Sequence, residues 1–272
     1  MVKRMTKQKL ALLLASVVTG ATVTSAFAAN TTNTASSFSA AQQEEIGKIA
    51  MEYLVNNPEV LIDASMELKA REDAKQNALR VSEAVKQKNA LLNDKETPFE
   101  GNANGDVAIV KFLDYQCSYC IKSSPIVDAI LAKNSDAKLL IKNFPILAKR
   151  SKLSDTAARV SLEVFKQQGE KGFAIYHQGI MQLGLDGEKL TEVNIQALVK
   201  KSGATVDLAQ LEEWSPELMK TMKLAQDLRF SGTPAYVVMP VKGANEQNTT
   251  VLGGYVEEAT LQAAVALAKQ QG

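Results

Sequence analysis

The sequence has 272 residues, of which 46% are hydrophobic and 22% are charged. Its 31 Lys and Arg residues nearly balance its 30 Asp and Glu residues, so the net charge is +1. This balance excludes a strongly basic nucleic-acid-binding protein and an acidic disordered tail. Two cysteines and one histidine exclude a disulfide-dense secreted scaffold and are too few for a four-ligand structural zinc site, so we expect no bound metal.

The first 28 residues have the three parts of a secretory signal peptide. A basic start precedes an apolar run from Leu10 to Val18, and Ala26-Phe27-Ala28 forms a small-x-small cleavage site. A membrane anchor is the alternative, but the apolar run is shorter than the ~18 residues that a transmembrane helix needs. Cleavage after Ala28 would remove four basic residues and no acidic one, which takes the net charge from +1 to −3. We therefore predict an exported, periplasmic protein whose cysteines enter an oxidising compartment.

Residues 29–38 are small and polar and are predicted to form a flexible leader, and residues 39–92 are predicted to form a helical arm. The spacing in the first part of the arm places five apolar residues on one helical face: Ile46, Ile49, Ala50, Tyr53 and Leu54. Asn56-Asn57-Pro58 ends this helix, because proline disfavours helical geometry in the residue before it. A second helix is predicted from Pro58 to about Leu92.

The second helix is a poor core element, because only half of its strict heptad positions are apolar. A lone helix of this kind cannot bury enough surface to be stable in water. We therefore expect residues 39–92 to associate with copies of themselves, as a homodimer or a homotrimer. The alternative is a solvated helix with frayed ends.

Residues 93–106 are rich in Asn, Gly and Asp and are predicted to link the arm to an α/β domain at residues 107–272. A segment with helical spacing, residues 118–132, lies between the first two predicted strands of this domain, which indicates a parallel βαβ unit. Helices are also predicted in an insertion at about 153–230 and in a closing segment at 257–269. The predicted strands are residues 107–113, 138–144, 235–239 and 249–252.

Both cysteines lie in one motif, Cys117-Ser118-Tyr119-Cys120, directly after a predicted strand and at the start of a helix. A helix N-terminus carries partial positive charge and free N–H groups, which stabilise a thiolate. Cys117 is predicted to be the attacking thiolate, and Cys120, one turn further on, to be buried and to resolve the mixed disulfide. Half of a zinc site and a structural disulfide are the alternatives. The chain has no second cysteine pair to complete the zinc site, and so short a disulfide loop at a helix start is strained and reducible.

Thr233-Pro234 strengthens the redox interpretation. The pair begins a predicted strand after the helical insertion, where a proline is tolerated only at the strand start or in a special turn. A cis peptide bond there would present the Thr233 backbone beside the thiol. The alternative is a trans proline that merely starts the strand.

These features together resemble a known family. The strand, Cys117-Ser-Tyr-Cys120, the inserted helices and Gly232-Thr233-Pro234 resemble the thioredoxin fold of DsbA-type periplasmic thiol–disulfide oxidoreductases. Tyr53-Leu54-Val-Asn-Asn-Pro58-Glu-Val60 and Asn143-Phe144-Pro145-Ile-Leu147 are similar to the subgroup with an N-terminal oligomerisation arm, which includes the suppressor-of-copper-sensitivity C proteins. The resemblance covers about residues 40–270. It implies an α/β thioredoxin fold with an inserted helical block, preceded by an N-terminal helical arm.

The resemblance also implies roles for individual residues. Cys117 would be the nucleophile and Cys120 the resolving thiol, and no cofactor is needed. Pro234 would be a cis-proline, and the substrate would contact Thr233 and Pro234 as well as Ser118 and Tyr119. Threonine before the proline is more similar to isomerase and bifunctional members than to the dedicated oxidases, which carry valine. The implied partners are unfolded or misoxidised secreted proteins and a membrane redox protein that recycles the cysteine pair.

One position departs from the family pattern. Members commonly carry a buried acid six residues before the first cysteine, which relays the proton of the resolving thiol, and here that residue is Lys111. A buried ammonium would favour a thiolate rather than accept a proton in the same way. Asp114 lies nearer to the motif, although strand alternation places it on the opposite face from Lys111. Lys111 and Asp114 are the two candidates for this relay.

The other candidate residues are predicted to be mainly structural. His177 is expected to be a satisfied histidine in a helix, while Phe112 and Tyr115, with Tyr119, are expected to form an apolar rim for the substrate.

Four interpretations of function remain open. An isomerase or bifunctional enzyme is favoured, because an oligomer that holds its active sites around a cleft can grip a client protein. A dedicated disulfide oxidase is the nearest alternative. A Cu(I)-binding protein is another, since soft thiolates suit that ion and Met219 and Met222 share a helix. A holdase chaperone that binds through its arms is the last.

Overall fold

A computed structural model describes residues 37–270. The predicted signal peptide at 1–28 and nearly all of the predicted leader at 29–38 lie outside these residues. The described residues divide into two units, the first ending at Leu61 and the second beginning at Ile62. Within residues 37–270, no helix is long and apolar enough to span a bilayer.

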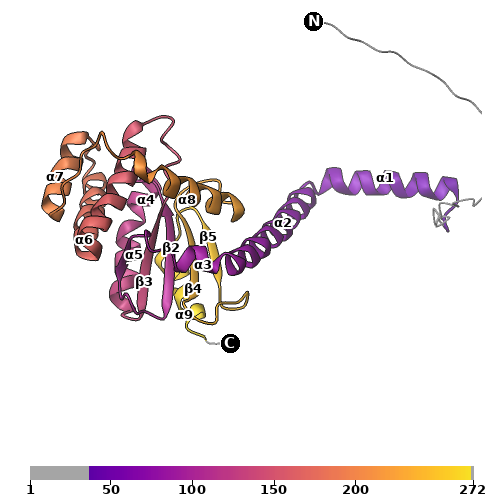
Figure 1. Ribbon diagram of the computed structural model, residues 1–272. Coiled ribbons are helices and arrows are strands. Elements are labelled where there is room, and N and C mark those ends of the chain that lie inside the picture. Colours follow the sequence, from indigo (N-terminus) through magenta and orange to yellow (C-terminus); the bar gives the residue numbers. More distant parts are fainter. Residues whose placement is uncertain (1–36, 271–272) are drawn as a thin grey trace, which may run out of the picture. The chain divides into compact units, whose positions relative to one another are not determined.

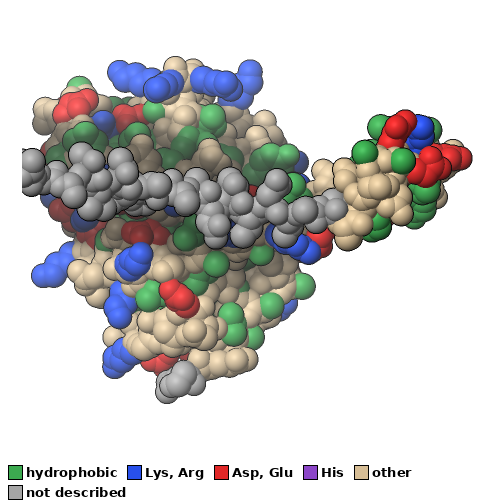
Figure 2. All heavy atoms as spheres, turned by 90° about the vertical axis from the view of Figure 1, so that its right-hand side faces the viewer, with side chains coloured by type: hydrophobic (Ala, Val, Ile, Leu, Met, Phe, Trp, Pro, Cys, Tyr) green, Lys and Arg blue, Asp and Glu red, His purple; other side chains and the backbone are tan. Residues whose placement is uncertain are grey.

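The first unit contains α1 (Ala40–Asn56) and the start of α2 (Glu59–Lys86). A capping box begins α1, with the Ser39 hydroxyl accepting a hydrogen bond from the Gln42 backbone N–H and the Gln42 side chain accepting one from Ser39. No residue of α1 is buried, and Ile49 and Tyr53 on the predicted apolar face are 59% and 57% exposed. Figure 2 shows hydrophobic side chains (green) interspersed with charged ones (red and blue) on the face of the molecule that it presents. The predicted break at Asn56-Asn57-Pro58 is confirmed.

The second unit is built on a five-stranded mixed sheet in the order β1-β3-β2-β4-β5 (Figure 1). Within this sheet β2 and β3 pair in parallel and the other neighbouring strands pair antiparallel, and the helices between β2 and β3 complete the predicted βαβ unit. The strands are β1 (Phe99–Gly101), β2 (Val107–Leu113), β3 (Ala137–Asn143), β4 (Ala235–Pro240) and β5 (Thr250–Gly253). Four of these strands match the predicted ones to within a residue or two.

Side chains alternate between two cores along β2. Ile109 and Leu113 face one core, formed with α5 (Ser124–Lys133), α6 (Lys152–Leu185) and α9 (Glu258–Ala268). Ala108, Val110 and Phe112 face the other, formed with the end of α2, α3 (Lys88–Leu92) and α8 (Ser215–Asp227). Because β2 is buried along its whole length, its residues form a continuous apolar run interrupted only by Lys111.

The segment predicted as a linker is packed onto this sheet. β1 lies within it and pairs with β3, and a strand of three residues is too short to give a periodic signal. The Asp94 carboxylate lies 2.9 Å from the buried Lys142 ammonium of β3, which also donates to the Thr97 hydroxyl at 2.6 Å. Val81, near the end of the predicted arm, is likewise buried in the core. The structure therefore joins residues 81–106 to the α/β domain.

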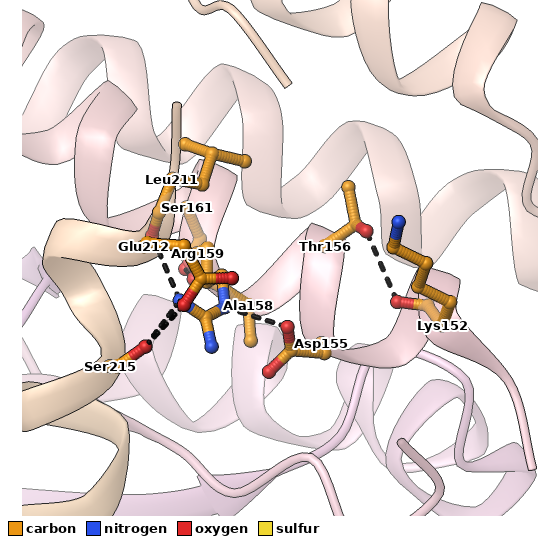
Figure 3. A network of polar contacts seen from close by, with 9 residues as sticks. All are labelled: Lys152, Asp155, Thr156, Ala158, Arg159, Ser161, Leu211, Glu212 and Ser215. Carbon is orange, nitrogen blue, oxygen red and sulfur yellow. Dashed lines mark hydrogen bonds and ion pairs between the residues drawn. The ribbon is translucent and has the colours of Figure 1, made fainter. Parts of the chain in front are cut away.

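The helical insertion is confirmed as α6, α7 (Glu192–Ser202), the 3₁₀ turn η1 (Glu212–Trp214) and α8. Gly169 bends α6, with a φ of 62° that a residue with a side chain rarely adopts. Within this insertion, Arg159 of α6 connects that helix to the segment that contains η1 and to the start of α8 (Figure 3). Its guanidinium donates to the Leu211 carbonyl at 2.9 Å and to the Ser215 hydroxyl at 2.8 Å, and lies 2.6 Å from the Asp155 carboxylate.

We expect Arg159→Met to lower the free energy of unfolding by about 1–3 kcal/mol, because the part-buried acceptors of Arg159 lose a charged donor. Urea denaturation followed by circular dichroism would measure this change. Arg71→Met is the matched control, since the partner of Arg71 within the described part of the chain is Glu67, on the exposed surface of α2. Equal effects of the two substitutions would contradict this role of Arg159.

Candidate active site

Cys117 and Cys120 lie at the start of α4 (Ser118–Lys122), between the end of β2 and α5. Cys117 is the N-cap residue, and its backbone N–H donates to the Asp114 carbonyl at 3.0 Å. Both thiols are free, with Cys117 8% exposed and Cys120 fully buried. The motif therefore presents one sulfur near the surface and a second directly behind it.

The two thiols have strongly different affinities for a proton. A hydrogen bond from Cys120, supported by Thr233 and by backbone N–H groups of α4, lowers the pKa of Cys117 to about 5. Burial, followed by the neighbouring Cys117, raises the pKa of Cys120 far above its ordinary value. At neutral pH Cys117 is therefore a thiolate and Cys120 a thiol that donates to it.

The Thr233–Pro234 peptide is cis and lies against Cys117. The Cys117 thiol is 3.2 Å from the Thr233 carbonyl oxygen, to which it donates when protonated. These residues meet because β4 pairs with β2, which places Ala235 opposite Phe112. The buried Thr233 hydroxyl makes no hydrogen bond elsewhere in residues 37–270, so it is available to donate to the thiolate. The expected cis geometry beside the thiol is confirmed.

The residues around the motif form a different surface from the predicted rim. Ser118 and Tyr119 are exposed, and the Lys122 ammonium lies 5.8 Å from the centre of the Tyr119 ring. Phe112 is fully buried in the core on the opposite face of the sheet, because strand alternation turns it away from the motif. Tyr115 is buried too, with its hydroxyl 3.1 Å from His177 Nδ1. The expectation of a rim formed by Phe112 and Tyr115 is wrong.

His177 and the methionines also lie outside the site. His177 is buried and stacks on Phe173, and burial lowers its pKa to about 3, so it stays neutral at ordinary pH. Met219 and Met222 are exposed on α8, whose buried Leu224 and Ala225 pack in the other core from the two cysteines. The two methionines therefore do not join the cysteines.

The two relay candidates have different surroundings. The Asp114 carboxylate accepts hydrogen bonds from the backbone N–H of Gln116, from that of Leu147 and from the Ser154 hydroxyl, at 2.7–2.8 Å. Asp114 therefore organises the loops around the motif. Lys111 is 1% exposed, and its ammonium donates to the Cys120 carbonyl at 3.4 Å. Burial lowers the pKa of Lys111, against the opposing influence of Cys120 and of nearby carboxylates.

A second buried ionisable group, Glu100, was not predicted from the sequence. It lies on β1 and is 5% exposed, and one carboxylate oxygen accepts a hydrogen bond from Gln178 at 3.1 Å. The other oxygen is buried and has no hydrogen-bond partner among residues 37–270. Burial raises the pKa of Glu100 to about 7. The sequence signal was only an acid between Phe99 and Gly101 in a segment that reads as a loop.

This raised pKa predicts a pH dependence of stability. Glu100 holds its proton more tightly in the folded state, so the free energy of unfolding should fall as pH rises from about 4.5 to about 7. The expected loss from this group is on the order of 3 kcal/mol. Glu100→Gln should remove that loss, making the variant more stable than the unsubstituted protein at pH 8 but not at pH 4. Urea denaturation at the two pH values tests this, and an equal stability difference at both would contradict it.

Two family models match the chain. The copper resistance protein ScsC N-terminal domain matches residues 42–75, and thioredoxin matches residues 93–258. The chain belongs to the thioredoxin family. Among solved structures, Salmonella enterica Typhimurium BcfH is 31% identical with a TM-score of 0.71, and the match covers 84% of this chain and 96% of that one. The predicted fold, with its inserted helices and N-terminal helical arm, is confirmed.

Two further structures place the chain among ScsC-like and oxidoreductase members of the family. Proteus mirabilis ScsC in a transitional conformation is 27% identical with a TM-score of 0.58, covering 86% of this chain and 98% of that one. A thioredoxin-like oxidoreductase from Silicibacter pomeroyi DSS-3 is 31% identical with a TM-score of 0.54, covering 68% and 98%. A search of curated proteins found no match. The chain is thus a thioredoxin-like thiol–disulfide exchange protein related to ScsC and BcfH.

Proposed function

We propose that this protein is an exported disulfide isomerase, or a bifunctional isomerase and oxidase, which acts on misoxidised secreted proteins in the periplasm. The observation that carries the proposal is the Cys117 thiolate at the start of α4, with Thr233–Pro234 on one side and the Cys120 thiol behind it. A stabilised thiolate that remains near the surface can attack a client disulfide, and a backbone carbonyl beside it can align the client chain.

The chemistry follows from the order of the two sulfurs. The Cys117 thiolate attacks one sulfur of a client disulfide, forming a mixed disulfide and releasing the other client sulfur as a thiolate. In isomerisation that thiolate, or another client cysteine, attacks within the complex, so that a new client disulfide forms and Cys117 leaves unchanged. If the client stalls, Cys120 attacks Cys117, which forms the Cys117–Cys120 disulfide and releases the client reduced.

The exposed apolar face of the helical arm favours isomerisation of client disulfides over their simple formation. Its first helix leaves Ile46, Ile49 and Tyr53 exposed along one face, which is a surface that helices bury by association. We propose that the arms join copies of this chain into a homodimer or a homotrimer, so that several active sites surround one client. A membrane redox protein would keep the cysteine pair reduced.

Export is supported by the sequence of residues 1–28 and by the periplasmic location of one protein of similar structure. One of the similar structures, 27% identical with a TM-score of 0.54, is a periplasmic thioredoxin-like protein from Salmonella enterica serovar Typhimurium. An oxidising compartment is also where disulfides form and need correction.

A dedicated oxidase is the second candidate, and the low pKa of Cys117 favours it. A thiolate stabilised in the reduced state makes the disulfide form a stronger oxidant. The two candidates differ in the redox form that acts: the isomerase works as the dithiol, and the oxidase works as the disulfide.

Refolding of ribonuclease separates these functions. The reduced protein is incubated with scrambled ribonuclease, and the oxidised protein with reduced ribonuclease, each beside a Cys117→Ala control. Recovery of ribonuclease activity from the scrambled form, lost in Cys117→Ala, is the expected result. Recovery only from the reduced form would identify a dedicated oxidase. Activity of neither kind, or activity that survives Cys117→Ala, would contradict a thiol-exchange function and favour copper binding or a holdase.

A further inference from the structure

A cavity of about 400 Å³ adjoins the cysteine motif where α4 meets the helical insertion. This volume falls within the range of ligand-binding pockets, roughly 300–1,000 Å³. We call the cavity the motif pocket. Five of its lining residues are aliphatic: Ile121, Leu147, Ile180, Leu183 and Leu190. Thr233 and Pro234 do not line it, so the motif pocket is separate from the surface that the cis peptide presents.

The motif pocket begins within one helical turn of Cys117. Gln116, which precedes Cys117, lines the pocket, and the backbone N–H of Ile121 donates to the Cys117 carbonyl at 3.1 Å. Gly184 lets α6 approach Ile121 closely, because a Cβ at Gly184 would lie 2.6 Å from Ile121 Cδ1. An extended chain advances about 3.3–3.6 Å per residue. A residue a few positions from a client cysteine at Cys117 can therefore reach the motif pocket.

The buried Asp114 carboxylate holds together the segments that line the motif pocket. It accepts hydrogen bonds from the backbone N–H of Gln116, after β2, and from that of Leu147, after β3, both at 2.8 Å. A third hydrogen bond comes from the Ser154 hydroxyl of α6 at 2.7 Å. Because Asp114 is 1% exposed, these hydrogen bonds lie in a medium of low dielectric, which strengthens them. The pocket is thus formed in advance, and binding requires little ordering of its walls.

Basic side chains lie at the rim of the motif pocket. Arg150 and Lys189 line it, and Lys149 precedes Arg150 in the same loop. All three side chains are exposed, and none forms an ion pair with another residue between 37 and 270. Glu188 is the one acid among the residues that line the pocket in this part of the chain. This excess of unpaired positive charge complements an acidic partner.

We propose that the motif pocket binds an aliphatic side chain of the client close to the cysteine under attack, and that Arg150 and Lys189 select clients with acidic residues beside that side chain. The proposal rests on the thiol-exchange function above and specifies its substrates. The chemical step is unchanged: the bond from Cys117 to one client sulfur forms as the client disulfide breaks, and the other client sulfur leaves as a thiolate with the bonding electrons. The motif pocket holds the client chain while this exchange occurs.

Three peptides test this proposal with the reduced mature chain. Each peptide contains one cysteine in a disulfide with 2-mercaptoethanol. The first carries a leucine and two glutamates close to that cysteine, the second replaces the leucine with serine, and the third replaces the glutamates with lysines. Hydroxyethyl disulfide, which has no peptide chain, is the reference. Mass spectrometry of acid-quenched samples gives the rate constant for each peptide, which is then divided by the rate constant for the reference.

The first peptide should react roughly tenfold faster than the second, relative to the reference, because the apolar pocket discriminates between leucine and serine. It should also react faster than the third, by a factor that falls as salt is added. Leu183→Ser should remove the preference for leucine. Leu185→Ser is its matched control, since Leu185 is 41% exposed on the same helix and does not line the motif pocket.

Charge reversal tests the rim, and it keeps the proposal testable if Leu183→Ser does not fold. Arg150→Glu combined with Lys189→Glu should make the lysine peptide react faster than the glutamate peptide. Lys171→Glu combined with Lys242→Glu makes the same change in net charge at exposed positions outside the pocket and should keep the original order. Similar relative rates for the three peptides would overturn the proposal, as would preferences that survive in the pocket variants or disappear equally in the controls. Absence of reaction even with hydroxyethyl disulfide would contradict the proposed function itself.

Discussion

Alkylation of the reduced protein by iodoacetamide is expected to modify Cys117 with a half-maximal rate near pH 5, the value to which its pKa is lowered, while Cys120 stays unmodified. The reason is that only the thiolate reacts, and the hydrogen bond from Cys120 is the largest contribution that stabilises it. Mass spectrometry of tryptic peptides after timed quenching would follow each cysteine separately.

Two variants separate the contributions that lower the pKa of Cys117. Cys120→Ala removes the thiol donor and should move the midpoint for Cys117 upward, toward the ordinary range of a cysteine. Thr233→Val removes only the hydroxyl and should move it less, because Thr233 is the smaller contribution. A midpoint near pH 8 to 9 in the unsubstituted protein would contradict the site as described, since Cys117 would then be largely protonated at neutral pH.

The arm is expected to set the assembly state. If the arms associate as proposed, Ile49→Glu combined with Tyr53→Glu should leave the chain a monomer, because both side chains lie on the apolar face of α1 and a buried carboxylate without a partner is costly. Sedimentation equilibrium of the mature chain would measure the mass. We also expect this double variant to lose the shuffling of scrambled ribonuclease while its Cys117 is alkylated at the usual rate.

The matched control replaces Met51 and Val55 with glutamate on the opposite side of the same helix. These residues are 64% and 68% exposed, so the change in charge and hydrophobicity is similar while the face differs. The control should keep the mass of the unsubstituted protein. If both double variants were monomers, the predicted face would not be the contact, and a monomeric unsubstituted protein would refute association altogether.

Sequence patterns predicted most of the helices and strands, because each of those segments carries a local signal. Val107–Leu113 and Ala235–Pro240 are apolar and β-branched runs, and the cysteine motif lies next to a strand end. β1 was missed because three residues have no period and its pairing with β3 joins segments almost forty residues apart. The same nonlocal pairing is what buries Glu100, so no feature of the sequence around that residue could identify it.

The errors around the site have a common cause. Phe112 and Tyr115 were assigned to the substrate surface from their nearness to the motif in sequence, although the alternation of β2 sends Phe112 to the opposite core. The cis geometry of Thr233–Pro234 was predictable, since a proline at a strand start after a redox motif suggested it, but the distance to Cys117 required the pairing of β4 with β2.

The packing of residues 81–106 determines where this protein can be divided. A fragment that starts at Asn93 would lack Val81, Leu91 and Leu92 from the core and would place a new charged terminus beside Asp94, the partner of buried Lys142. An exchange of arms between relatives, or a fusion of the thioredoxin-like domain to another protein, therefore needs a junction upstream of Val81, in the exposed part of α2. The sequence suggests a junction in residues 93–106, the predicted linker. A junction at the end of that segment would remove the edge strand β1 and its buried Glu100.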